Sequence, residues 1–279
     1  MRRGAIIFLA TLTMLIAPHA RAQSPAIPQF WDVKERLPRP DLTDVPRIRF
    51  LTTIDFPPFN FIDSNGLLSG FHVDLARAIC RELEIMDRCQ IQALPWDELE
   101  PAMQRSEGEA LIAGLAVTPE GREKYVFSRS YLRFPARFAV RNDSALAEPI
   151  YKAIKGKTVG VIAGSEHEAM LRDFFPDAKP AAFDNAEAQF AALKDGKVEA
   201  IFGDGMRFGF WLGGSVSEKC CRFAGGPYLA PEYLGNGLAI AVGLNHEKLA
   251  AAFDYALREI SASGEFEELY LRYFPIGFF

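Results

Sequence analysis

Three charged residues stand shortly after apolar runs of the chain, where polar ligands are commonly bound. Arg122, Glu166 and Asp204 each follow a segment rich in β-branched or other apolar residues. In open α/β sheets, ligands bind outside the carboxyl ends of the strands. An arginine at such a place can pair with an anion, and a carboxylate can accept hydrogen bonds from a cationic ligand. The pattern therefore indicates a site for a small polar ligand.

Four strand-to-helix junctions of this kind can be read from the sequence. They cover residues 54–59, 114–122, 163–166 and 202–205. We expect the first two junctions to belong to one lobe and the last two to another. A cleft that closes between two such lobes would bring all four junctions together.

Arg122 also has an explanation that needs no ligand. Thr118 and Pro119 are typical of the N-cap and the first position of a helix. Arg122 would then lie close to a helix start, where the macrodipole disfavours a cation. We therefore expect Arg122 to bind an external anion, with an exposed surface arginine as the alternative.

The acidic residues have similar alternatives. Asp204 stands between two glycines, which leave its carboxylate accessible, but an acid there can also cap a helix or turn. Ser165 and Glu168 form an S-x-x-E capping box, and Glu166 at the first helical position can simply be a partner of the helix dipole. We include Ser165, Glu166 and Asp204 among the predicted ligand contacts.

The elements that would position these residues alternate between strand and helix. Residues 48–54 are rich in β-branched and other apolar residues, and two consecutive prolines soon after them cannot continue a hydrogen-bonded ladder. A turn at 63–66 and apolar residues at helical spacing from Leu75 to Leu83 follow. Further strands are predicted at 90–94, 110–115, 138–140, 158–163, 198–202 and 237–242, and helices at 72–83, 96–105, 166–174, 186–195 and 248–263. This alternation predicts an α/β fold with parallel sheets covered by helices on both faces.

The start of the first predicted helix resembles a known family signature. It is similar to that of the bacterial periplasmic solute-binding proteins of family 3, the polar amino-acid type, over about residues 47–275. His72 stands where an acid is usual in this signature. The matching residues are Gly70, Phe71, Val73, Asp74 and Leu75.

The resemblance implies a two-lobed periplasmic-binding-protein fold of type II, in which each lobe is a mainly parallel sheet with helices on both faces. The first lobe would comprise residues 47–139 and 230–279, and the second lobe residues 140–229. Two extended segments, 138–142 and 227–233, would form the hinge.

The resemblance also implies roles for site residues. Asp204 matches the acid that accepts hydrogen bonds from the α-ammonium group of the ligand, and Phe56 and Trp96 match an aromatic pair that sandwiches its side chain. The arginine that holds the α-carboxylate in the family corresponds to Gly121, and Arg122 comes one residue later, roughly 100° around a helix. The predicted ligand contacts are Phe56, Trp96, Gly114, Ala116, Thr118, Arg122, Ser165, Glu166 and Asp204.

The first 22 residues are typical of a secretory signal peptide, with two arginines, a short apolar run and an Ala-Arg-Ala cleavage site. No cysteine stands directly after the cleavage site, so we expect a soluble periplasmic protein without a lipid anchor. Removing three arginines and no acids moves the formal charge from −5 to −8, which argues against nucleic-acid binding. Residues 23–46 are proline-rich and predict either an extended leader over the fold or a disordered tail.

The four cysteines would be exported to a compartment where disulfides persist. We favour a Cys80–Cys89 disulfide, and the family often has a short bridge at this place. The alternative is that Cys80 is simply buried on the apolar face of its helix. Cys220 and Cys221 could form a vicinal bridge, pair elsewhere or stay free. None of the four has the spacing of a metal site, and we expect no metal.

The favoured function is a periplasmic substrate-binding protein of an ABC importer. It would bind an amino acid or close derivative as a monomer, present it to an inner-membrane permease, and need no cofactor. Two alternatives are an exported cyclohexadienyl (prephenate/arogenate) dehydratase-like enzyme, with Glu166 or Glu168 as general acid, and a sensory protein that serves a membrane receptor. Two carboxylates on one side of the cleft, Glu166 and Asp204, would favour a basic or amide amino acid.

Overall fold

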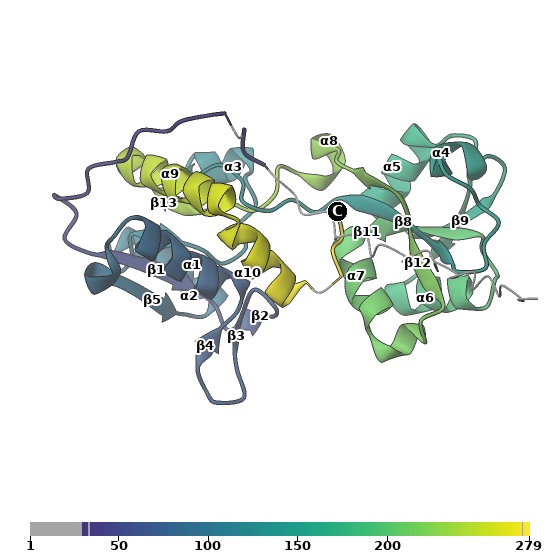
Figure 1. Ribbon diagram of the computed structural model, residues 1–279, viewed down its shortest axis with the longest axis horizontal. Helices are drawn as coiled ribbons and strands as arrows, with labels where there is room; N and C mark the ends of the chain where they lie inside the picture. The colour runs from purple at the N-terminus through teal and green to yellow at the C-terminus, as the bar shows by residue number, and fades with distance from the viewer. Residues whose placement is uncertain (1–29, 33, 275) are drawn as a thin grey trace, which may run out of the picture.

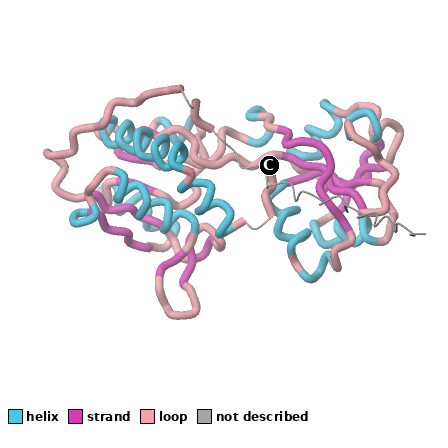
Figure 2. Tube along the Cα trace, viewed as in Figure 1, coloured by secondary structure: helices cyan, strands magenta, loops and turns pink. Residues whose placement is uncertain are grey.

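The computed structural model describes residues 30–32, 34–274 and 276–279. The predicted signal peptide lies outside these residues. The chain forms two lobes (Figure 2), and each is built on a five-stranded sheet. The predicted two-lobed α/β fold is confirmed. Within the described residues, no helix has the length and apolar character needed to cross a membrane.

The first lobe has the strand order β5-β1-β6-β13-β7. Strand β1 runs parallel to β5 and β6, whereas β13 is antiparallel to β6 and β7. The strands are β1 (Ile48–Thr52), β5 (Cys89–Ala93), β6 (Ala110–Leu111), β7 (Tyr125–Phe127) and β13 (Ala241–Gly243). The helices are α1 (Phe71–Glu82), the 3-10 turn η1 (Met86–Arg88), α2 (Trp96–Gln104), α3 (Pro119–Arg122), α9 (Glu247–Ser263) and α10 (Glu265–Tyr273).

The second lobe has the strand order β10-β9-β11-β8-β12. Strand β9 is parallel to β10 and β11, and β8 is antiparallel to β11 and β12. The strands are β8 (Ala136–Arg141), β9 (Thr158–Ile162), β10 (Lys179–Phe183), β11 (Ala200–Asp204) and β12 (Cys221–Tyr228). The helices are α4 (Ile150–Ala153), α5 (Glu166–Phe174), α6 (Ala186–Lys194), α7 (Gly205–Gly213), the 3-10 turn η2 (Ser215–Ser217) and α8 (Pro231–Leu234).

Both sheets are mixed, with two parallel and two antiparallel pairings each, rather than mainly parallel. The reason is that β8 and β13, which follow the two crossings between the lobes, run opposite to their neighbours in the sheets. The segment 138–142, expected to be part of the hinge, is one of these: Phe138 is fully buried and its strand β8 pairs with β11 and β12. The chain therefore reaches the second sheet before Ala136.

The two consecutive prolines lie in the turn between the first two strands of a small separate sheet beyond β1. Strand β1 ends at Thr52, and β2 (Asp55–Phe56), β3 (Asn60–Ile62) and β4 (Leu68–Ser69) form a three-stranded antiparallel unit that projects from the first lobe (Figure 1). Gly70 follows β4 with φ of 129°, and a Cβ there would lie 2.2 Å from the carbonyl oxygen of Phe59. Only glycine fits this close approach, which leads directly into α1.

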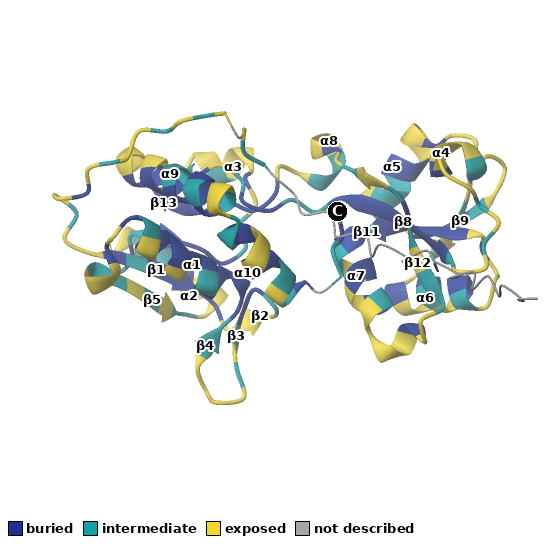
Figure 3. Cartoon of the chain, viewed as in Figure 1, coloured by how far each residue is buried: buried dark blue, intermediate teal, exposed yellow. Residues whose placement is uncertain are grey.

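Each lobe has its own buried layer between sheet and helices (Figure 3). In the first lobe, Leu75 and Ile79 of α1 are completely buried, as the helical spacing predicts. The predicted Cys80–Cys89 disulfide is present and joins α1 to β5, with Cα atoms 6.2 Å apart. Cys220 and Cys221 also form a disulfide, the vicinal alternative.

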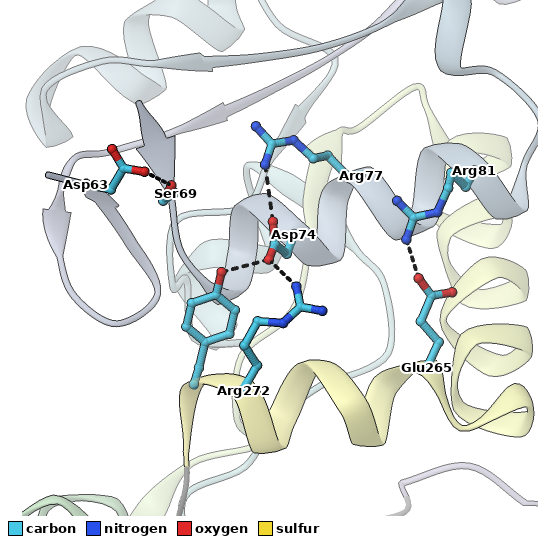
Figure 4. A network of polar contacts seen from close by, with 8 residues as sticks. Asp63, Ser69, Asp74, Arg77, Arg81, Glu265 and Arg272 are labelled. Atoms are coloured by element: carbon cyan, nitrogen blue, oxygen red, sulfur yellow. Dashed lines mark hydrogen bonds and ion pairs between the residues drawn. The ribbon is translucent and has the colours of Figure 1, made fainter. Parts of the chain in front are cut away.

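A polar network joins α1 to α10 on the first lobe (Figure 4). The carboxylate of Asp74 accepts hydrogen bonds from Arg77 Nη1 at 3.2 Å, Arg272 Nη1 at 2.9 Å and the Tyr273 hydroxyl at 2.7 Å. Burial, with the hydrogen bond to Asp74, raises the pKa of Tyr273 to about 12, so it stays a neutral donor. This network fixes the last helix against the first.

The leader lies over the first lobe, the first of the two predicted alternatives, for its described residues 30–32 and 34–46 (Figure 1). Arg88 donates to the carbonyl oxygens of Leu42 and Val45 at 3.0 and 2.5 Å. Glu35 pairs with Arg129 at 2.5 Å. The leader is therefore part of the first lobe's surface.

Candidate functional site

The first two predicted junctions meet at Phe56 and Gly114. The Phe56 ring stacks on Phe59, with ring centroids 4.7 Å apart, and remains 37 % exposed. Gly114 has φ of 88°, and a Cβ there would lie 2.7 Å from Phe56 Cε1. The ring therefore lies directly over the Gly114 backbone, so the glycine is needed for this aromatic surface.

Trp96 lies at the start of α2 and is 58 % exposed. Together with Asp97, Glu100 and Tyr125 it lines a cavity of about 200 Å³ on the first lobe. Glu100 is paired with Lys124 at 2.8 Å, whereas Asp97 is exposed. The indole thus stands beside negative charge, an arrangement that suits a cation.

The Thr118 cap is confirmed: its hydroxyl accepts a hydrogen bond from the Gly121 backbone N–H at 3.0 Å, and Pro119 is the first helical residue. The reason given for Arg122 is wrong, however. Helix α3 is a single turn that ends at Arg122, so this cation lies in the last turn, where the macrodipole favours it. Arg122 is exposed, and its role as a ligand contact stays a prediction.

Gly121 stands where the resemblance predicts the carboxylate-binding arginine. A Cβ at Gly121 would lie 3.1 Å from Phe127 Cζ and 3.3 Å from Thr118 Oγ1. These neighbours crowd the position, so a larger residue there would have to displace them. The remaining residue of this junction, Ala116, is exposed and forms an isolated bridge with Leu238.

At the third junction, Ser165 caps α5. Its hydroxyl accepts from the Glu168 N–H at 3.2 Å and donates to the Ile162 carbonyl at 2.7 Å. The Glu168 carboxylate accepts from the Gly164 N–H at 2.8 Å, one residue earlier than a capping box requires, and from Arg172 at 2.6 Å. The bond from Arg172 lowers the pKa of Glu168. A general acid needs a raised pKa, so Glu168 is unsuited to the dehydratase alternative.

Asp204 and Glu166 lie at the starts of α7 and α5, the helices that follow the adjacent strands β11 and β9 of the second lobe. Asp204 caps α7, with its Oδ1 accepting from the backbone N–H groups of Met206 at 2.8 Å and Arg207 at 3.3 Å. This is the alternative noted from the sequence, but it occupies only Oδ1 and leaves Oδ2 for another donor. Glu166 is exposed at the first position of α5.

The third and fourth junctions lie at the same edge of the second sheet, because they follow the adjacent parallel strands β9 and β11. His167 lies between them: burial lowers its pKa, the negative charges of Asp204 and Glu166 act in the opposite direction, and the charge of Arg207 lowers it further. Arg207 was missed because its helix, α7, was not predicted. If that helix had been predicted, the spacing of three residues would have placed Arg207 on the same side as Asp204.

A buried polar chain lies behind Phe56 and Gly114. Asn60 Nδ2 donates to Thr53 Oγ1 at 2.6 Å, so its Oδ1 accepts from His72 Nδ1 at 2.7 Å. His72 Nε2 then accepts from the Tyr131 hydroxyl at 2.8 Å. Burial lowers the pKa of His72 to about 3, which keeps the imidazole neutral. The sequence marked His72 only as a departure from the family signature.

The comparison with known proteins decides the family. The sequence profile of the bacterial extracellular solute-binding proteins, family 3, matches residues 48–276. The chain belongs to this family. The resemblance carried by the residues around Gly70 is therefore confirmed.

Two relatives come from Escherichia coli (strain K12). ABC transporter arginine-binding protein 1 is 28 % identical over 82 % of this chain and 91 % of its own length. Putative ABC transporter arginine-binding protein 2 is 30 % identical over 81 % and 90 %. Among solved structures, the L-cystine solute receptor of Neisseria gonorrhoeae in its unliganded open conformation has a TM-score of 0.71 at 18 % identity, covering 83 % of this chain and 94 % of that one. That likeness concerns the fold alone.

As a family member, the solute-binding protein is expected to use the cleft between its lobes. The predicted contacts fall into a first-lobe set (Phe56, Trp96, Gly114, Ala116, Thr118 and Arg122) and a second-lobe set (Ser165, Glu166 and Asp204). Within the described ranges, no group of three or more His, Cys, Asp or Glu side chains is placed to hold a metal ion.

Proposed function

We propose that the protein is the periplasmic, monomeric receptor of an ABC importer and that its solute is a cationic amino acid of the arginine type. The observation that carries this proposal is the carboxylate pair of the second lobe. Strands β9 and β11 are adjacent and parallel, so Glu166 and Asp204, at the starts of the helices that follow them, lie at the same edge of the second sheet. Neither forms an ion pair with another side chain in the part of the chain that the structure describes.

The first lobe supports the same solute class. Aromatic faces attract cations, and Trp96 lines its cavity together with Tyr125 and the exposed Asp97. The crowded Gly121 leaves no arginine at the family's usual carboxylate-binding position. The exposed cations nearest to the junctions in sequence, Arg122 and Arg207, are the candidates for binding the carboxylate of the solute.

The names of two relatives support the proposal. The two Escherichia coli proteins are named arginine-binding proteins of ABC transporters, and they match most of this chain. An inner-membrane permease is accordingly the proposed partner, and the predicted signal peptide fits export to the periplasm. The formal charge remains unsuited to nucleic acid.

A solute panel tests the proposal on the purified mature chain. Arginine, lysine, histidine, glutamine and glutamate are compared by thermal shift and calorimetry. We expect arginine or lysine to raise the melting temperature by mass action and glutamate to have no effect. Tight glutamate binding would show that the carboxylates do not set specificity.

Glu166→Gln tests the exposed carboxylate of this pair. A charged hydrogen bond to a cationic solute is worth about 1–3 kcal/mol, so its loss should weaken binding by roughly 5- to 150-fold. Glu247→Gln is the matched control, because Glu247 also occupies the first position of a helix, α9. That helix follows the antiparallel strand β13 and so starts at the opposite edge of its sheet. Equal affinity of Glu166→Gln and the control would remove Glu166 from the site.

A further inference from the structure

The two lobes are in contact through a segment that is not one of the two hinge crossings. Residues 276–279, the tail segment, follow α10 of the first lobe and lie against α7 of the second (Figure 1). We propose that the tail segment is a third inter-lobe connection, which positions α7, and with it Asp204, relative to the first lobe. This proposal does not depend on which solute is bound.

The first-lobe end of this connection is firmly held. Arg272 and Tyr273, at the end of α10, both donate to Asp74 of α1 (Figure 4). The backbone N–H of Phe278 donates to the Tyr270 hydroxyl at 3.1 Å, and the two rings lie 5.3 Å apart. Phe278 is 1 % exposed and belongs to the first-lobe core.

The second-lobe end rests on a glycine face of α7. Gly205, Gly209 and Gly213 are four residues apart and therefore share one side of the helix. A Cβ at Gly209 would lie 3.3 Å from the carbonyl oxygen of Ile276, and one at Gly205 would lie 3.2 Å from that of Phe278. The tail segment thus lies directly on the helix backbone. Each helical glycine costs roughly 0.5–1 kcal/mol relative to alanine. The tail is the nearest neighbour of Gly209 and Gly213, whereas Gly205 is crowded first by Arg137 and the Pro135 carbonyl, at 2.8 and 2.9 Å from its added Cβ.

Arg137 ties the same contact to the start of β8. Its side chain is buried, with Nη1 donating to the Phe278 carbonyl at 3.2 Å and Nε donating to the Gly225 carbonyl at 2.9 Å. The guanidinium lies 4.4 Å over the Phe223 ring. Within the described residues, no carboxylate forms an ion pair with Arg137. Loss of the tail segment would leave a buried charged donor unpaired, which is unfavourable.

The contact has room to adjust when the lobes move. A cavity of about 270 Å³ lies between α7 and the tail segment, lined in part by Met206, Phe210, Phe274 and Ile276. Because Asp204 caps the start of α7, a shift of the helix along the tail changes the position of this predicted ligand contact. The tail segment therefore restricts how far the second lobe swings away from the first.

The distance between the lobes in solute-free protein tests this proposal. Spin labels are attached to cysteines introduced at the exposed residues Gln104 of the first lobe and Lys152 of the second, while the four native cysteines stay in disulfides. We expect a narrow distance distribution for the otherwise unmodified chain. Deletion of residues 276–279, Gly209→Val and Arg137→Met should each broaden it and move it to longer distances.

Arg141→Met is the matched control. Arg141 belongs to the same strand, β8, but pairs with Asp143 at the surface, so its replacement should leave the distribution unchanged. If the deletion unfolds the first lobe, Gly209→Val decides, because it changes only the second-lobe side of the contact. Unchanged distributions for both Gly209→Val and Arg137→Met, with cooperative unfolding retained, would overturn the proposal.

Discussion

His72 places a neutral imidazole where the family signature usually has an acid. It is completely buried, and its two nitrogens are used by Asn60 and Tyr131. A Cβ added at Gly114 would lie 3.7 Å from His72 Cε1, so the ring supports the backbone beneath Phe56. A neutral His72 lowers the free energy of unfolding under acidic conditions, because His72 binds a proton in the unfolded chain but not in the folded one.

Replacing His72 by glutamine should change how stability depends on pH. The pKa of His72 is lowered from 6.5 to about 3 in the folded protein. Between these values the unfolded state binds more protons, so wild-type stability falls as the pH drops, at up to about 1.4 kcal/mol per unit from this group. His72→Gln should be less stable at pH 7, because a buried hydrogen bond is lost, yet show a shallower decline below pH 6.5. Urea unfolding at a series of pH values measures both.

The comparison of slopes contains its own control. Carboxylates with lowered pKa values, such as Asp63, also weaken the fold in acid but do so equally in both proteins. Parallel stability curves for wild type and variant would mean that His72 is protonated in the folded state.

Helix α3 contains one residue whose role could be predicted from the sequence and one whose role could not. The Thr118 cap followed from side-chain chemistry alone, and it is present. The position of Arg122 in its helix did not follow, because the length of α3 depends on where β7 must begin in the sheet. Whether the macrodipole favours or disfavours a charge depends on where the helix begins and where it ends. The sequence predicted only the beginning of α3.

Helix α7 shows the same limit at the scale of an element. Its sequence, GMRFGFWLG, combines three glycines with apolar residues on all sides, so helical periodicity is weak. Glycine also disfavours an isolated helix. The helix forms because Asp204 caps it and the tail segment packs on its glycine face, and the second of these partners is 63 or more residues away in the chain. By contrast, α5 was predicted with its observed bounds, since its cap and its apolar face are local.

Because Asp204 is both a helix cap and a predicted ligand contact, two substitutions separate its roles. Asparagine caps a helix about as well as aspartate, whereas alanine costs about 1 kcal/mol. Asp204→Asn should therefore keep the stability of the free protein and Asp204→Ala should lower it. Both should bind the cationic solute more weakly, since both lack the charge. Chemical denaturation and calorimetry with arginine give the two readouts.

The affinities and stabilities of the two variants together show whether Asp204 binds the solute or only caps α7. Wild-type affinity in Asp204→Asn, with lower stability in Asp204→Ala, would leave Asp204 as a structural cap only.

At the scale of the whole molecule, two lobes and their α/β character were predictable because strand and helix signals alternate along the chain. The lobe crossings were not, because an extended segment has the same sequence signature whether it joins two lobes or pairs within a sheet. Residues 138–142 are the example: their apolar run lies inside β8, between two antiparallel neighbours. The packing of the tail segment on the second lobe likewise depends on contacts far apart in sequence.

Solute binding should bring the lobes together. Trp96 and Phe56 of the first lobe are 58 % and 37 % exposed, and Glu166 of the second lobe is exposed as well. A small solute that touches both sets buries them only if the lobes close about the hinge. We therefore expect saturating arginine to reduce the radius of gyration in small-angle scattering. It should also protect tryptophan fluorescence from acrylamide quenching.

The fluorescence change should come from Trp96. Trp211 is 7 % exposed within the second lobe. Trp31, in the leader, lies under the guanidinium of Arg129. Neither tryptophan faces a predicted junction. Trp96→Phe should accordingly abolish the protection but keep the decrease in radius of gyration, because an aromatic ring is retained and the lobes still close. Saturable arginine binding with no change in the radius of gyration would place the solute on one lobe alone. In that case the carboxylates of the second lobe and the aromatic surface of the first would not act on the same ligand.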